Sequence, residues 1–325
     1  MSKFSEFGNA LYSGDRSFNF TGRRKVWYTI SLVVIAISAI LPFTLHNGYN
    51  FGIEFKGGSE FTISGGANKG TEVARTVLDA ALPGKEIVVS TVGTDTVRVQ
   101  TPQLSDTKSE EVRQALAKSY SVESAAVSSS FIGASWGTDV TGKAVNGLLW
   151  FLALAAILMA IYFRTVKMSV AAMSALLHDL LITAGIYGAL GLEVTPAAVI
   201  GFLTILGYSL YDTVVVFDKI RENTFEVEFS ETQTFAERVN LAINQTLVRS
   251  INTSVVAVLP VASILFIGAA LLGAGTLRDI ALALFIGIIV GTYSTIFIAA
   301  PAYSHLREGE AKYANAAKKV LTARQ

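Results

Sequence analysis

The sequence predicts a polytopic α-helical membrane protein with six transmembrane helices and one small α+β domain outside the membrane. Of its 325 residues, 51% are hydrophobic and only 16% are charged, and the mean hydropathy is +0.49. Six apolar segments contain 138 residues, of which only Asp179 and Asp212 carry a formal charge. The other 187 residues contain the remaining 49 charged side chains, a proportion typical of protein exposed to water. This partition excludes a soluble globular protein, a disordered chain and a secreted disulfide scaffold.

The six apolar segments are long enough to cross a bilayer. They comprise residues 26–45, 144–163, 168–192, 195–217, 250–275 and 280–303. A hydrocarbon core about 30 Å thick needs about 20 apolar residues in a helix, and the lack of water there requires helical backbone. Any single segment could be a buried core helix, but six in one chain favour membrane helices. The first segment exceeds the about 7–15 residues of a signal-peptide core, so we expect a retained anchor.

Lysine and arginine are concentrated on one side of the expected membrane. The two tails, the link between segments two and three and the link between segments four and five hold 16 of them, whereas the short opposite links hold only Arg278. Because cytoplasmic loops are enriched in positive charge, both termini are expected in the cytoplasm. The expected parts are a cytoplasmic tail (1–25), a first helix (26–46), an extracytoplasmic domain (47–143), helices two to six (144–303) with a cytoplasmic loop (219–249), and a cytoplasmic C-terminal tail (304–325).

Residues 47–143 have the composition of an ordinary soluble domain. Their pattern is strand, helix, hairpin, helix, strand, with the hairpin turn at Gly93-Thr94-Asp95. This order predicts a split βαβ, ferredoxin-like domain. The sequence of this region contains no catalytic triad, metal-ligand cluster or phosphate loop. The net charge of the chain is +1, which gives no indication of nucleic-acid binding.

Asp212 is the most informative residue of the apolar segments. It lies about 9 Å from the cytoplasmic end of the fourth segment. An ionised acid in hydrocarbon is costly, so we expect it to face the interior of the helix bundle and to have a function, such as loading and releasing a proton. The structural alternative is an interhelical hydrogen bond or a fixed ion pair. Arg249, at the cytoplasmic end of the fifth segment, is either a permanent cation that Asp212 meets and leaves or an anchor that snorkels to the interface.

Three further polar residues are weaker candidates. His178 and Asp179 are adjacent near the middle of the third segment, where they form either a proton relay or a structural hydrogen-bonded pair. Neighbours on a helix point about 100° apart, so the two cannot both face one partner squarely. Asp218 lies at the membrane boundary and is interpreted as an interfacial charge.

Two features of the sequence predict how helices pack. Gly287 and Gly291 form a GxxxG pair, which is typical of close contact between membrane helices. Gly201, Gly207, Tyr208 and Ser209 are expected to allow a similar close approach around Asp212. In the cytoplasmic loop, apolar residues at helical spacing within 235–247 predict an amphipathic helix on the membrane surface.

Four motifs together resemble a known family. Residues 207–223 read GYSLYDTVVVFDKIREN, residues 244–254 read NQTLVRSINTS, the third segment contains His178-Asp179, and residues 52–58 read GIEFKGG. These motifs resemble those of SecF proteins, which belong to the SecD/SecF family of bacterial protein-export membrane proteins, and the resemblance covers about residues 20–305. Glu54 lies where many members carry aspartate, so the carboxylate is kept.

The resemblance implies half of a pseudo-symmetric transporter of the RND (resistance–nodulation–division) type, whose other half is SecD. It implies a multi-pass protein of the bacterial plasma (inner) membrane that works with SecD beside the SecYEG channel, with YajC as a further candidate partner. Such a complex uses the proton motive force to promote late export of unfolded preproteins. Asp212 and Arg249 match the proton pathway of the family, and Glu54, Gly57 and Gly58 match its motif after the first helix. The resemblance implies no cofactor other than protons, no metal and no enzyme activity.

The sequence alone leaves two rival functions open. An RND-type half-transporter for lipid or drug would favour a larger outer domain with an apolar pocket of ligand size. A non-conducting structural subunit would tolerate the loss of the charges at Asp212 and Arg249.

Overall fold

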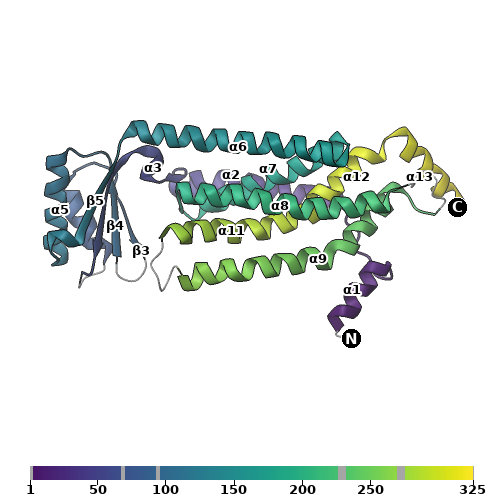
Figure 1. Ribbon diagram of the computed structural model, residues 1–325, viewed down its shortest axis with the longest axis horizontal. Coiled ribbons are helices and arrows are strands. Elements are labelled where there is room, and N and C mark those ends of the chain that lie inside the picture. Colours follow the sequence, from purple (N-terminus) through teal and green to yellow (C-terminus); the bar gives the residue numbers. More distant parts are fainter. Residues whose placement is uncertain (1–2, 67–69, 93–95, 226–231, 269–274, 325) are drawn as a thin grey trace.

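The protein is a bundle of membrane helices with an α+β domain at one end. The structure, a computed structural model, describes residues 3–66, 70–92, 96–225, 232–268 and 275–324. Within these residues, six helical spans are long and apolar enough to cross a membrane. The spans are α2 (Arg24–His46), α6 (Ala134–Phe163), α7 (Val166–Ala189), α8 (Pro196–Asn223), α9 (Phe235–Ser263) with the π-helix η3 (Ile264–Gly268), and α11 (Gly275–Ser294) with the π-helix η4 (Thr295–Ala299) and α12 (Ala300–Glu308). Both termini lie at the end of the bundle opposite the α+β domain (Figure 1), and the predicted polytopic helical architecture is confirmed.

The α+β domain is a four-stranded antiparallel sheet with two helices. Its elements are β2 (Gly58–Ser64), α4 (Thr71–Ala81), β3 (Val88–Val92), β4 (Thr96–Thr101), α5 (Asp106–Tyr120), the 3₁₀ turn η1 (Ser124–Ala126) and β5 (Val127–Ile132). The strand order is β3-β4-β2-β5. Alternate side chains such as Phe61 and Val99 pack against Leu78 of α4 and Leu116 of α5, as expected for a sheet with one covered face. The predicted turn at Gly93-Thr94-Asp95 lies outside the described residues.

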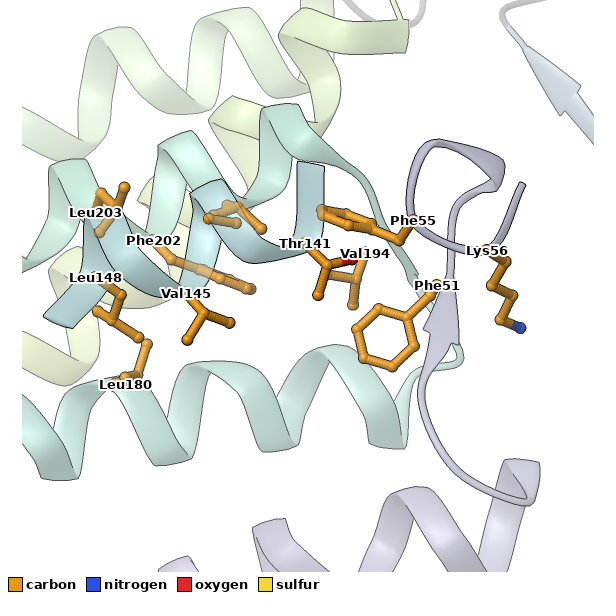
Figure 2. A pocket seen from close by; sticks show the side chains of 12 residues that line it. Phe51, Phe55, Lys56, Thr141, Val145, Leu148, Leu180, Val194, Phe202 and Leu203 are labelled. Carbon is orange, nitrogen blue, oxygen red and sulfur yellow. The ribbon is translucent and has the colours of Figure 1, made fainter. Parts of the chain in front are cut away.

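Helix α6 begins earlier than the sequence predicts. It starts at Ala134, directly after β5, so the region that the sequence assigned to the outer domain (47–143) ends in a part of the second membrane helix. Helix α6 lies along the outside of α7, and the rest of the chain buries only a small part of its apolar surface. An apolar pocket separates it from α7 and α8 at the end nearest the α+β domain (Figure 2).

Helix α9 also differs from the prediction. The sequence placed residues 235–249 in a cytoplasmic loop (219–249) with an amphipathic surface helix, but these residues are the first half of α9. A capping box starts the helix, because Thr234 Oγ1 accepts a hydrogen bond from the Glu237 amide (3.3 Å) while Glu237 Oε2 accepts one from the Thr234 amide (2.8 Å). Its apolar side chains are buried by other parts of the chain instead of by lipid: Phe235, Val239, Ala242, Ile243 and Leu247.

The two tails are folded onto this half of α9. Helix α1 (Lys3–Ser13) contacts α9, and Asn240 Oδ1 accepts a hydrogen bond from the Phe20 amide at 2.7 Å. Asn244 Oδ1 accepts another from the Phe18 amide at 2.8 Å. After helix α13 (Ala311–Ala323), Arg324 forms an ion pair with Glu237 at 2.7 Å. The amino-terminal half of α9 therefore organises the end of the bundle that carries both termini.

Candidate functional site

Asp212 is a buried carboxyl group within the membrane helices. It lies on α8 and is only 5% exposed. Its Oδ1 accepts a hydrogen bond from Ser250 Oγ on α9 at 2.9 Å. Its Oδ2 is buried and has no hydrogen-bond partner among the described residues. An unpaired buried polar atom is destabilising, so this oxygen is available for a proton or for a donor that another chain supplies.

Small residues on α11 allow its close contact with α8 beside Asp179. A Cβ added to Gly287 on α11 would overlap Ile205 of α8, and one added to Gly291 would lie 3.1 Å from Ser209 Cβ. The GxxxG pair therefore permits the close contact that its spacing predicts. Gly201 also lies in close contact with α11, since a Cβ added there would lie 2.6 Å from Ala283 Cβ. The same expectation for Gly207 is wrong, because no heavy atom of the described residues would lie within 4 Å of a Cβ added there.

Arg249 lies next to the site but does not pair with it. Its side chain is exposed, and among the described residues no ion pair within 4 Å joins it to Asp212. The hydrogen bond to Asp212 comes instead from Ser250, the residue that follows it on α9. Arg249, the permanent cation, is thus exposed on α9, whereas the carboxyl group of Asp212 is buried.

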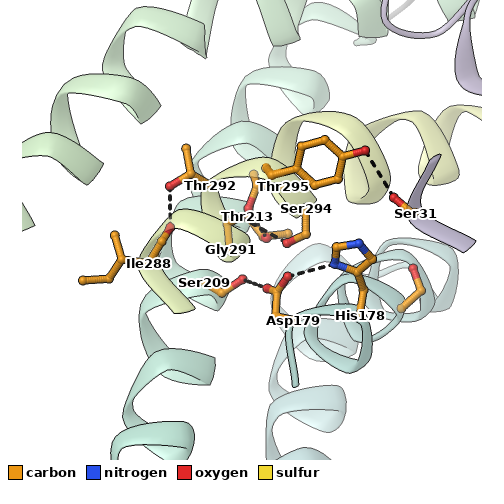
Figure 3. A network of polar contacts seen from close by, with 12 residues as sticks. Ser31, His178, Asp179, Ser209, Thr213, Ile288, Gly291, Thr292, Ser294 and Thr295 are labelled. Carbon is orange, nitrogen blue, oxygen red and sulfur yellow. Dashed lines mark hydrogen bonds and ion pairs between the residues drawn. The ribbon is translucent and has the colours of Figure 1, made fainter. Parts of the chain in front are cut away.

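His178 and Asp179 form the centre of a second buried group (Figure 3). His178 Nδ1 lies 3.2 Å from Asp179 Oδ1, and Ser209 Oγ of α8 donates to Asp179 Oδ2 at 2.6 Å. The His178 ring stacks on Tyr293 of α11 with 5.9 Å between centroids, and its Nε2 has no partner within the described part of the chain. Both residues are almost fully buried. The pair connects α7 to α8 through the hydrogen bond from Ser209 and to α11 through the ring contact with Tyr293.

Hydroxyl groups extend both sites, and sequence reasoning missed most of them. Thr213 Oγ1 lies 3.0 Å from Thr295 Oγ1, and Ser254 Oγ lies 2.5 Å from Thr292 Oγ1. Ser250 and Ser254 are four residues apart on α9, as are Ser209 and Thr213 on α8. Hydroxyl residues at that spacing lie on one helix face. This pattern, present in two apolar segments, was the sequence signal that could have predicted the polar contacts between these helices.

Asp218 is separate from these groups. It lies near the end of α8, where Tyr162 Oη donates to its Oδ2 at 3.0 Å in an exposed position. Its interpretation as an interfacial charge stays a prediction. Among the residues that the structure describes, no group of three or more His, Cys, Asp or Glu side chains is placed to hold a metal ion.

The motif after the first helix lies at the junction with the α+β domain, at the other end of the bundle from the termini. Helix α3 (Ile53–Lys56) precedes Gly57 and Gly58, which have φ angles of 76° and 150°. A Cβ on Gly58 would lie 2.5 Å from the Thr101 carbonyl oxygen, and one on Gly57 would lie 3.1 Å from the backbone of Ala134. Glycine is therefore required at both positions by conformation and by space. The motif builds the junction and does not contact Asp212.

Glu54 lines a polar cavity of about 360 Å³ at this junction, together with Glu60, Arg98 and Asp279. Burial raises the pKa of Glu54 above its usual value, and the nearby carboxylates of Glu193 and Glu60 act in the same direction. Its Oε2 has no hydrogen-bond partner in the described residues. Glu54 therefore takes up a proton at a higher pH than an exposed glutamate does.

An ion pair joins the α+β domain to the membrane helices across this junction. Arg98 of β4 contacts Glu193 of β6 (Glu193–Val194), which lies between α7 and α8 and pairs with β1 (Asn50–Phe51). Gln100 Nε2 donates to Glu193 Oε1 at 2.7 Å. The side chains of Arg98 and Glu193 are only 25% and 13% exposed, so water screens the pair less than a surface ion pair.

Loss of this ion pair should loosen the α+β domain over the bundle. We expect Arg98→Gln to broaden the distribution of distances between spin labels on α5 and α8, measured by pulsed electron resonance. The control is Arg113→Gln, which removes an exposed ion pair with Glu110 within α5 (2.7 Å). Distributions of equal width in the two variants would show that the Arg98–Glu193 contact does not orient the domain.

Comparison with known proteins identifies the family. Residues 111–309 match the family model described as "Protein export membrane protein SecD/SecF, C-terminal". The whole chain is 44% identical to protein translocase subunit SecF of Streptomyces coelicolor, of which it covers 86%. The chain belongs to the SecD/SecF family.

Other members of the SecD/SecF family agree with this assignment. Protein translocase subunit SecF of Mycobacterium tuberculosis is 40% identical over 98% of this chain and 73% of its own length. The crystal structure of SecDF from Thermus thermophilus, a translocon-associated membrane protein, superposes with a TM-score of 0.77 at 35% identity over 90% of this chain. This chain spans only 39% of that SecDF chain. The family resemblance that the four motifs predicted is therefore confirmed.

Proposed function

We propose that this chain is the SecF subunit of the protein translocase. With SecD it uses the proton motive force to promote the late stage of protein export through SecYEG. Membership of the SecD/SecF family supports the role in translocation. The observation that carries proton coupling is Asp212, a carboxyl group buried among membrane helices with one oxygen bonded to Ser250 and the other unpaired.

The proposed coupling step is a change in the contact between α8 and α9. When Asp212 is ionised, it accepts a charge-assisted hydrogen bond from Ser250, and such bonds are stronger than neutral ones. A proton on Asp212 removes that charge and weakens its attraction for Ser250 and for Arg249 beside it. A potential of 100 mV is worth about 2.3 kcal/mol per charge moved across the membrane, which is enough to bias a conformational equilibrium. No cofactor or covalent step is needed.

SecD is the proposed partner in the membrane. The SecDF chain of Thermus thermophilus is longer than this chain and similar to it over 39% of its length, which supports a complementary half. The proposed binding face includes α8 and α9 around Asp212, where Gly207, Tyr211 and Arg249 are exposed. A donor from SecD would then meet the unpaired Asp212 Oδ2. SecYEG, the emerging preprotein and YajC are proposed as further partners.

The proposed location is the bacterial inner membrane, with both termini in the cytoplasm. The α+β domain then lies outside the cytoplasm, where an emerging chain would meet it. We infer a ferredoxin-like fold for this domain, since the strand order β3-β4-β2-β5 with helices after the first and third strands supports it.

Reconstituted vesicles test the proposed function. SecYEG, SecD and this chain are placed in one membrane, and the release of a secreted protein on the far side is timed with and without a proton gradient. We expect the gradient to accelerate release only when this chain is present, and a protonophore to remove the acceleration. Acceleration that persists without this chain, or that needs no gradient, would contradict the proposal; the latter result would indicate a structural subunit.

A further inference from the structure

An apolar slot lies in the membrane part of the protein, apart from the carboxyl groups described above. It is the pocket between α6, α7 and α8, with a volume of about 330 Å³. Its walls include Val145 and Leu148 of α6, Leu180 of α7 and Phe202 of α8 (Figure 2). An apolar cavity of about 150 Å³ already excludes water and binds benzene, so the slot has room for a longer apolar group.

The position of the slot limits what can fill it. Leu203, in its wall, lies seven residues into α8, which is about 10 Å from the end of that helix. Leu180 lies nine residues before the end of α7, at about 14 Å. These depths match half of a hydrocarbon core about 30 Å thick. The slot therefore extends over one leaflet, on the side of the α+β domain.

The slot is open to the lipid side of the bundle. Val145 in its wall is 50% exposed, and α6 is the span that lies on the outside of α7. In a bilayer the apolar groups that surround such an opening are acyl chains.

A single cation marks the mouth of the slot. Lys56, the last residue of α3, lies beyond Phe51 and Phe55, with its nitrogen turned away from the apolar side chains (Figure 2). It is exposed and makes no ion pair within the described residues. An unpaired cation beside an apolar slot complements an anionic phospholipid, which joins an acyl chain to a headgroup of net negative charge.

We propose that the slot binds one acyl chain of an anionic phospholipid from the leaflet next to the α+β domain, with the lipid phosphate at Lys56. The chain fills the space between α6 and the pair α7 and α8. The lipid thereby joins the second membrane helix to the rest of the bundle at the junction where the α+β domain begins. This role needs neither a proton nor a secreted chain.

Photo-crosslinking of the full chain in lipid nanodiscs tests this proposal. The discs contain phosphatidylcholine with a small, equal fraction of either phosphatidylglycerol or phosphatidylcholine that carries a diazirine near the middle of one acyl chain. Peptide mass spectrometry maps the labelled residues. We expect labelling to concentrate at Val145, Leu148 and Leu180. It should be about fivefold stronger with phosphatidylglycerol, because its headgroup has a net negative charge that attracts Lys56, whereas choline neutralises the phosphate of phosphatidylcholine.

Two pairs of variants separate the slot from general contact with lipid. Val145→Trp fills the slot and should reduce labelling of Leu180 to the level of Leu154, an exposed residue of α6 outside the slot; Leu154→Trp is the matched control. Lys56→Gln should remove the preference for phosphatidylglycerol, whereas Lys143→Gln, at an exposed lysine of α6 outside the slot, should keep it. Val145 and Lys56 are exposed positions, and thermal unfolding of each variant checks that the fold is kept.

Four results would overturn the proposal. The first is uniform labelling of all lipid-exposed positions, and the second is equal labelling of Leu180 in Val145→Trp and Leu154→Trp. The third is a phosphatidylglycerol preference that survives Lys56→Gln. Crosslinks from the slot to a second copy of the chain or to a secreted protein, in place of lipid, would assign it to a different occupant.

Discussion

Replacement of Asp212 by asparagine should abolish the gradient-dependent part of export. Asparagine has nearly the same size, and its carbonyl oxygen can still accept the hydrogen bond from Ser250, but it cannot bind and release a proton. The bias that one charge contributes at 100 mV, about 2.3 kcal/mol, corresponds to about 40-fold in a conformational equilibrium. We therefore expect the gradient-dependent acceleration of release in vesicles to fall by about that factor, while the complex with SecD still assembles.

Asp218→Asn is the matched control for this experiment. Asp218 lies on the same helix, but it is half-buried and, among the described residues, accepts a hydrogen bond from Tyr162 in an exposed position. Its replacement should leave the acceleration within about twofold of the unmodified protein, as is usual for surface substitutions. Equal losses in the two variants, or normal proton-driven export with Asp212→Asn, would refute a proton-carrying role for Asp212.

Replacement of Gly185 by leucine should separate α2 from α7. A Cβ at Gly185 would lie 2.7 Å from both the Cα and the carbonyl oxygen of Ser38 on α2. Because these are backbone atoms, a side-chain rotation cannot relieve the overlap and one helix must move. Overpacking of this kind costs about 1–3 kcal/mol and sometimes more. We expect a lower midpoint of thermal unfolding in detergent and a lower yield of folded protein.

Gly207→Leu provides the comparison for Gly185→Leu. Both glycines lie within membrane helices, so leucine removes the same backbone flexibility at each position. Gly207 has open space around it, and its replacement should leave the unfolding midpoint of the isolated chain unchanged or slightly higher. If the two variants unfold at the same temperature, the close approach of α2 and α7 at Ser38 does not contribute to stability.

The membrane helices were predictable because the bilayer imposes a local requirement. Each span must be apolar over about 20 residues, and this can be counted without knowing any neighbour. The two errors concern residues that lie just before an apolar segment, 235–249 and 134–143, where this requirement does not apply. An apolar face on residues 235–247 can be covered by lipid or by protein, and the pattern is the same for both; the structure covers it with protein. The polar residues 134–143 resemble a soluble domain, yet they extend α6 beyond the apolar segment.

The candidate site was predictable only in part. Asp212 was conspicuous because a carboxylate in an apolar segment is rare, and the structure confirms that it is buried. Its partner Ser250 gave no such signal, since a serine in a membrane helix is common and only the rotation of α9 against α8 brings it to Asp212. The side-chain position of Arg249 depends on that same rotation. The sequence therefore could not distinguish an ion pair from the exposed side chain that the structure has.

The length of α9 has a mechanical consequence. Helix α9 from Phe235 to Ser263 has 29 residues, or about 44 Å at about 1.5 Å per residue, and Ser250 lies near its middle. A tilt of this rod about its contact with Asp212 would move its two ends in opposite directions. One end is held to the amino-terminal tail by Asn240 and Asn244, and the other lies towards the α+β domain (Figure 1). A change in charge at Asp212 would thus displace both ends of α9 at once, one on each side of the membrane.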